Sequence, residues 1–137
     1  MIDKRDILLI GLNHKTAPVE IRECIGFAGD QTEQALLALQ ALDAVHEVLL
    51  LSTCNRVEVL LTTPDKDRAA RQVIAFLSAT NDIPAAEFED KLYRHTGDEA
   101  VRHIFRVAAS LDSMVVGEPQ ILGQIKDAYR LAATKKT

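Results

Sequence analysis

The sequence has no tryptophan, only two cysteines, and only two tyrosines and four phenylalanines among its 137 residues. No stretch approaches the eighteen or so apolar residues of a membrane-spanning helix. Cys24 and Cys54 are too few for a disulfide framework, and no Cys/His pair has the spacing of a zinc site. These absences argue against a membrane protein and a cysteine-stapled fold, and they predict no metal.

A secretory signal is also lacking. The first apolar run, at 6–12, is too short, and acidic residues stand on both sides of Lys4 and Arg5. The sequence therefore predicts a cytoplasmic protein of one domain, long enough to form a core without staples.

The net charge of −4 argues against a general nucleic-acid binder, but the charge is uneven. Residues 1–90 hold 8 basic against 15 acidic side chains, whereas residues 91–137 hold 8 against 5. The C-terminal third is therefore either a solvated basic helix face or a surface that can meet a phosphate backbone.

Apolar periodicity predicts strands at 6–12, 46–52, 56–63 and 91–96, with helices between them. A short helix is expected to begin near Pro18, in VEIRECIGF (19–27). Further helices are expected over 29–42 with Asp30 as its N-cap, after Thr63-Pro64, after Thr96, and over about 118–133. Three of these helices have a clear apolar face. For the helix over 29–42 it is Ala35, Ala38, Leu36, Leu39 and Leu42. For the helix after Pro64 it is Ala69, Ala70, Val73, Ile74 and Leu77, and for the helix after Thr96 it is Ala100, Val101, Ile104, Phe105 and Ala108.

This order predicts an α+β fold. It matches a ferredoxin-like split β-α-β antiparallel sheet, with a sheet subdomain at about 1–96 and a C-terminal helical extension at about 97–137. Helices are expected to cover one face of that sheet.

The segment LLLSTCNRVEVLL, at 49–61, places a thiol and a guanidinium where two predicted strands should be joined by an ordinary hairpin turn. A two-residue hairpin usually turns on Asn-Gly or Asp-Gly, and no glycine is present here. Cys54 is either a small buried hydrophobe or a reactive thiol, since Arg56 two residues away favours the thiolate. The residues alone leave the two readings about even.

Two further places carry candidate chemistry. His103 lies on a helix beside Ile104, either as a satisfied or solvent-facing histidine or as an imidazole that reaches into a cleft. The segment GEPQILGQIK, at 117–126, fits neither phosphate-loop pattern. Its Gln120 and Gln124 share a helix face, which is either a polar surface or a site for an amino-acid head group.

Three blocks of this chain together resemble the signature blocks of glutamyl-tRNA reductase, in the same order and spacing. They are GLNHKTAPVEIRE (11–23), STCNRVEV (52–59) and LDSMVVGEPQILGQIK (111–126). The resemblance covers nearly all of residues 1–137 and corresponds to the catalytic domain of that family. It implies that the family's NADPH-binding and dimerisation domains are absent from these residues.

The resemblance implies that Cys54 attacks the aminoacyl ester of glutamyl-tRNA and forms a thioester. NADPH, bound by another domain, then reduces the thioester to glutamate-1-semialdehyde, the first step of tetrapyrrole (porphyrin) biosynthesis. His103 is the expected histidine near the thiol. The expected substrate-binding residues are Thr53, Asn55, Arg56, Ser113, Glu118, Pro119, Gln120 and Gln124.

The resemblance also implies a homodimeric full-length enzyme, with glutamate-1-semialdehyde aminotransferase as a possible partner. The isolated residues 1–137 are expected to be monomeric and unable to reduce the substrate. The alternative is a non-catalytic ferredoxin-like module that binds RNA or a partner. RNA-reading sheets use exposed aromatic residues, and none falls in 46–61, which favours the enzyme.

Overall fold

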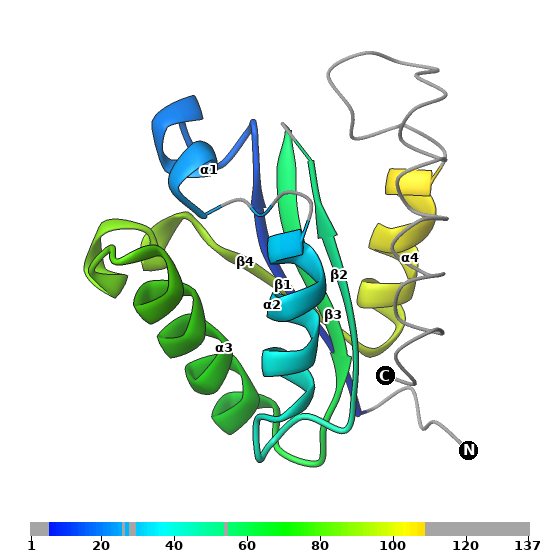
Figure 1. Ribbon diagram of the computed structural model, residues 1–137. Coiled ribbons are helices and arrows are strands. Elements are labelled where there is room, and N and C mark those ends of the chain that lie inside the picture. The colour runs from blue at the N-terminus through cyan, green and yellow to red at the C-terminus, as the bar shows by residue number, and fades with distance from the viewer. Residues whose placement is uncertain (1–5, 26, 28–29, 54, 109–137) are drawn as a thin grey trace.

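A four-stranded antiparallel sheet forms the centre of the computed structural model, which describes residues 6–25, 27, 30–53 and 55–108 (Figure 1). Its strands are β1 (Ile7–Asn13), β2 (Glu47–Ser52), β3 (Arg56–Thr62) and β4 (Tyr93–Thr96). They lie in the order β2-β3-β1-β4, with β1 antiparallel to both β3 and β4. This is the strand order of a ferredoxin-like split β-α-β sheet, so the predicted fold class is confirmed.

Helices cover both faces of the sheet. On one face lie α1 (Val19–Ile25), α2 (Asp30–Gln40) and α3 (Lys66–Asn81), and on the other lies α4 (Gly97–Ala108) (Figure 1). Two short 3-10 turns, η2 (Ala85–Glu87) and η3 (Glu89–Lys91), connect α3 to β4. The prediction that helices cover only one face was therefore wrong. The reason lies in β3, because successive residues of this strand point to opposite faces of the sheet and residues on both faces are buried.

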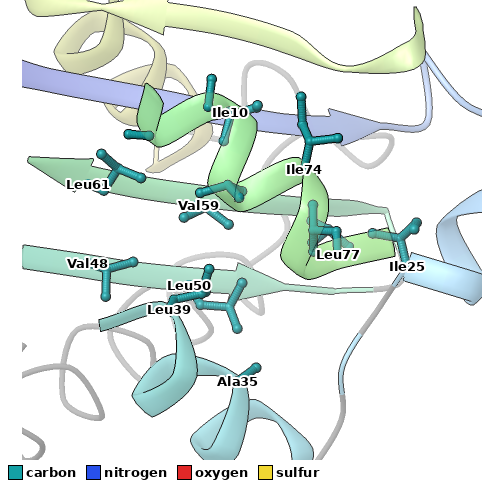
Figure 2. Packing of buried hydrophobic residues seen from close by; sticks show 14 of the residues in the cluster. Ile10, Ile25, Ala35, Leu39, Val48, Leu50, Val59, Leu61, Ile74 and Leu77 are labelled. Atoms are coloured by element: carbon teal, nitrogen blue, oxygen red, sulfur yellow. The ribbon is translucent and has the colours of Figure 1, made fainter. Parts of the chain in front are cut away.

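The main core lies between the sheet and the helices α1 to α3 (Figure 2). Its residues come from every second position of the strands, because successive side chains of a strand point to opposite faces. The buried side of α3 consists of the five residues predicted for it: Ala69, Ala70, Val73, Ile74 and Leu77. The helix starts after Asp65, whose side chain accepts a hydrogen bond from the backbone N–H of Arg68 at 3.1 Å.

The helix α4 departs from its predicted apolar face. Ala100 is buried as expected, but Phe105 is 69% exposed, and its neighbours on the buried side are His103 and Val107. The prediction for Phe105 was wrong because the sheet face beneath α4 carries charged groups, so a histidine takes the central buried position. A smaller apolar contact joins Val107 to Leu51 of β2.

Some predictions concern parts of the chain outside the described residues. They include the helix at 118–133, and the cap expected of Asp30 depends on a side chain that is not described. Among the described residues, no helix is long and apolar enough to cross a membrane.

Candidate functional site

The β2–β3 turn is closed by a threonine side chain in place of a glycine. The hydroxyl oxygen of Thr53 accepts hydrogen bonds from the backbone N–H groups of Asn55 at 3.1 Å and Arg56 at 3.2 Å. The backbone N–H of Thr53 donates to the carbonyl oxygen of Arg56 at 2.8 Å. These bonds fix the two described neighbours of Cys54, while Cys54 itself lies outside the described residues.

Arg56 begins β3 and is almost fully buried, with 1% of its surface exposed. It stands opposite Asn13 of β1, and its Nη1 donates to Oε1 of Glu58 at 3.0 Å. The resemblance implies that Arg56 helps to bind the substrate. In this structure its guanidinium has a carboxylate partner within the chain.

Glu58 is the centre of a buried polar cluster that we call the Glu58 cluster: Arg56, Glu58, Tyr93 and His103. While Oε1 takes the hydrogen bond from Arg56, Oε2 accepts one from the Tyr93 hydroxyl at 3.0 Å and is bonded to Nε2 of His103. Both Glu58 and His103 are buried. The cluster therefore joins β3, β4 and α4 on the sheet face opposite the main core.

Gly11 makes room for this carboxylate. It pairs with Glu58 on one side and with Tyr93 on the other, so these two side chains meet above it. A Cβ atom at position 11 would stand 2.5 Å from the Val57 carbonyl oxygen and 2.9 Å from Cγ of Glu58. Glycine is the residue type that allows such a close approach within a strand.

Electrostatics keep Glu58 ionised. Burial is the largest single influence and would raise the pKa of Glu58, because it disfavours the charged form. The hydrogen bond and charge of His103, together with the charge and hydrogen bond of Arg56, outweigh burial and lower the pKa below its usual value. The carboxylate is therefore an acceptor for all of its partners.

A second histidine lies against the cluster. The rings of His95 and His103 stack with their centroids 4.6 Å apart. The centroid of the Tyr93 ring lies 5.4 Å from that of His95 and 5.3 Å from that of His103. Burial and then the charge of His103 lower the pKa of His95. At a pH near the ordinary histidine pKa, a larger fraction of His95 is therefore neutral than of an unperturbed histidine.

The structure brings four of the predicted site residues into one region. Thr53, Asn55 and Arg56 form the hairpin turn, and His103 joins them through Glu58. The other predicted residues, Cys54, Ser113, Glu118, Pro119, Gln120 and Gln124, lie outside the described part of the chain. Their roles remain predictions.

The sequence analysis missed Glu58, Tyr93 and His95. A signal for Glu58 was present, since Arg56 and Glu58 alternate with valines and so share one face of the strand. Opposite charges two residues apart in an otherwise apolar strand indicate a buried ion pair. Nothing in the sequence indicated Tyr93, because its contact with Glu58 depends on β1 lying between β3 and β4.

No group of three or more His, Cys, Asp or Glu side chains that could hold a metal ion occurs within residues 6–53 and 55–108 as far as they are described.

Comparisons with known proteins agree on one family. The family model described as "Glutamyl-tRNAGlu reductase, N-terminal domain" matches residues 10–137. Glutamyl-tRNA reductase from Desulfatibacillum aliphaticivorans is 52% identical over 132 residues, which is 96% of this chain and 30% of that protein. The enzyme of the same name from Syntrophobacter fumaroxidans is 54% identical over 132 residues, covering 96% and 29%.

A solved structure gives the same result. Glutamyl-tRNA reductase from Methanopyrus kandleri superposes with a TM-score of 0.74 and 35% sequence identity, over 97% of this chain and 29% of that one. The chain thus spans about 30% of the length of these relatives. From its sequence, its fold and these matches, the chain belongs to the glutamyl-tRNA reductase family and corresponds to the N-terminal domain of that family.

Proposed function

We propose that this chain carries out the acyl-transfer half of glutamyl-tRNA reduction. The Cys54 thiolate attacks the carbonyl carbon of the aminoacyl ester, the bond to the tRNA 3′-oxygen breaks, and a thioester forms on the sulfur. The leaving oxygen takes up a proton from His103, which replaces it with the proton that the Cys54 thiol released. The observation that supports this proposal is the family match, which spans residues 10–137 and includes position 54.

The hairpin suits this chemistry. Thr53 and Asn55 are held by hydrogen bonds on a rigid two-strand scaffold, as is common where binding and catalytic groups stand on turns. A nearby guanidinium, that of Arg56, favours the thiolate. Arg56 also binds the glutamyl carboxylate in this proposal, with Glu58 holding the guanidinium from its other side.

The later steps need parts of the family outside residues 1–137. NADPH bound by another domain of the family would supply the hydride that reduces the thioester to glutamate-1-semialdehyde, with the Cys54 thiolate as the leaving group. The working enzyme is a cytoplasmic homodimer that delivers this product to glutamate-1-semialdehyde aminotransferase.

Mass spectrometry after mixing the chain with glutamyl-tRNA tests the proposal. We expect one glutamyl adduct, on the peptide that contains Cys54. The Cys24→Ser variant should keep the adduct and the Cys54→Ser variant should lose it, because a hydroxyl is far less ionised than a thiol near neutral pH. An adduct that persists in Cys54→Ser would refute the assigned nucleophile.

The alternative, an RNA- or partner-binding module with an inert thiol, finds little support. Sheets that read RNA expose aromatic side chains on an open face. Here α1 to α3 cover one face, α4 packs on the other, and Tyr93 is bonded to Glu58. Selective alkylation of Cys54 over Cys24 at neutral pH would further favour the enzyme, whereas equal inertness would favour the module.

A further inference from the structure

We propose that Glu58 is a positioning residue of the site, which sets the tautomer of His103 and thereby makes Nδ1 the ring nitrogen that exchanges a proton during acyl transfer. This inference rests on the proposed function. The juxtaposition that carries it is the buried carboxylate between the guanidinium of Arg56 and the imidazole of His103.

The two oxygens of Glu58 have separate tasks. Oε1 faces Arg56, which can only donate hydrogen bonds, while Oε2 faces the Tyr93 hydroxyl and Nε2 of His103. An ionised carboxylate has no proton to give. The hydrogen of the neutral His103 ring must therefore be on Nε2, and the lone pair is left on Nδ1.

The surroundings of the ring support this assignment. From β3 the ring faces Glu58, with Arg56 behind it, and from β4 it contacts Tyr93 and His95. Of these groups, Glu58 is the one bonded to Nε2. In hydrolase triads a carboxylate likewise fixes the tautomer of an imidazole and stabilises the cation that forms, although there it is bonded to Nδ1 and Nε2 is the reacting nitrogen.

The ¹⁵N chemical shifts of the imidazole nitrogens test the tautomer directly. They are measured on the labelled 137-residue chain at a pH where the ring is neutral, with His103→Gln used to assign the signals. We expect a protonated Nε2 and an unprotonated Nδ1. The opposite pattern in the unaltered chain would overturn the inference without any need for a variant.

The Glu58→Gln variant tests the consequence. Its amide oxygen can still accept from Arg56, so its NH₂ group is turned toward His103 and requires an acceptor at Nε2. The His103 proton should then move to Nδ1. The rate of glutamyl-adduct formation on Cys54 should fall by about 10² to 10⁴-fold, the range that general acid–base catalysis contributes.

Glu47→Gln, the same substitution at an exposed position of β2, is the matched control. It leaves the Glu58 cluster unaltered, so the His103 tautomer should not change and the adduct rate should stay close to that of the unaltered chain. A Glu58→Gln chain that keeps both the tautomer and the rate would contradict the inference. If the unaltered chain forms no adduct, the proposed function fails, and the ¹⁵N shifts still decide whether Glu58 sets the tautomer.

Discussion

At the scale of single residues, the site depends on an atom that is missing. Gly11 has no side chain, and Cγ of Glu58 lies in the space that a Cβ would take. The obstacle to a larger residue is partly backbone, because the nearest atom to an added Cβ would be the carbonyl oxygen of Val57. A flexible side chain could move aside, but this strand cannot do so without disturbing its pairing with β1.

Gly11→Ala should therefore destabilise the fold and displace Glu58. Overpacking at a tight site costs about 1–3 kcal/mol of unfolding free energy. Urea unfolding followed by circular dichroism measures this loss. Arg94→Ala, at an exposed position of β4, is the control and should stay within about 0.5 kcal/mol of the original. Equal midpoints for Gly11→Ala and the unaltered chain would show that the strands can separate at no cost.

At the scale of elements, predictability follows from what each element packs against. The buried side of α3 was predicted correctly because it faces an apolar core, so its hydrophobic spacing reports its orientation. The buried side of α4 was not, since His103 packs on a carboxylate and Phe105 points outward. A hydrophobic pattern cannot orient a helix whose main contact is a polar cluster assembled from distant strands.

The β2–β3 hairpin was also predicted, but the way its turn closes was not. The sequence showed that glycine was absent, and the structure shows the Thr53 hydroxyl in its place. Thr53→Val keeps the shape and removes the hydroxyl, so two backbone N–H groups lose their acceptor. We expect a loss of about 0.5–3 kcal/mol in unfolding free energy, from one or two hydrogen bonds of ordinary strength.

Thr53→Ser supplies the matched control for this turn, because it restores the hydroxyl without the methyl group. Thermal unfolding of both variants should place Ser near the original and Val clearly below it. If Val and Ser unfolded at the same temperature, the two hydrogen bonds would contribute nothing to the turn.

At the scale of the whole molecule, the Glu58 cluster links stability to pH. The pKa of Glu58 is lower in the folded state than in the unfolded chain, so the folded state favours the ionised form. Its contribution is complete above the ordinary glutamate pKa of about 4.3 and is lost as the pH falls below that value through the lowered folded one. Unfolding free energy should therefore decline over this acidic range.

Urea titrations at a series of pH values between neutrality and acid measure this decline. Glu58→Gln should show a shallower slope, because it removes a group that must be protonated on acid unfolding. Glu47→Gln is the control, because Glu47 is an exposed residue of β2. It should leave the dependence of the unfolding free energy on pH close to that of the unaltered chain. An unchanged slope in Glu58→Gln would mean that other carboxylates account for the acid sensitivity.

The Glu58 cluster includes residues that are far apart in the sequence, so the ribosome synthesises them at different times. Arg56 precedes Glu58 by two residues, whereas His103 follows it by 45. At the usual 5–20 residues per second, translation needs roughly 2–9 s to pass from one to the other. For that interval Glu58 has Arg56 beside it but not His103, and one side of β3 has no helix over it. The emergence of α4 from the ribosome is thus the event that completes the Glu58 cluster.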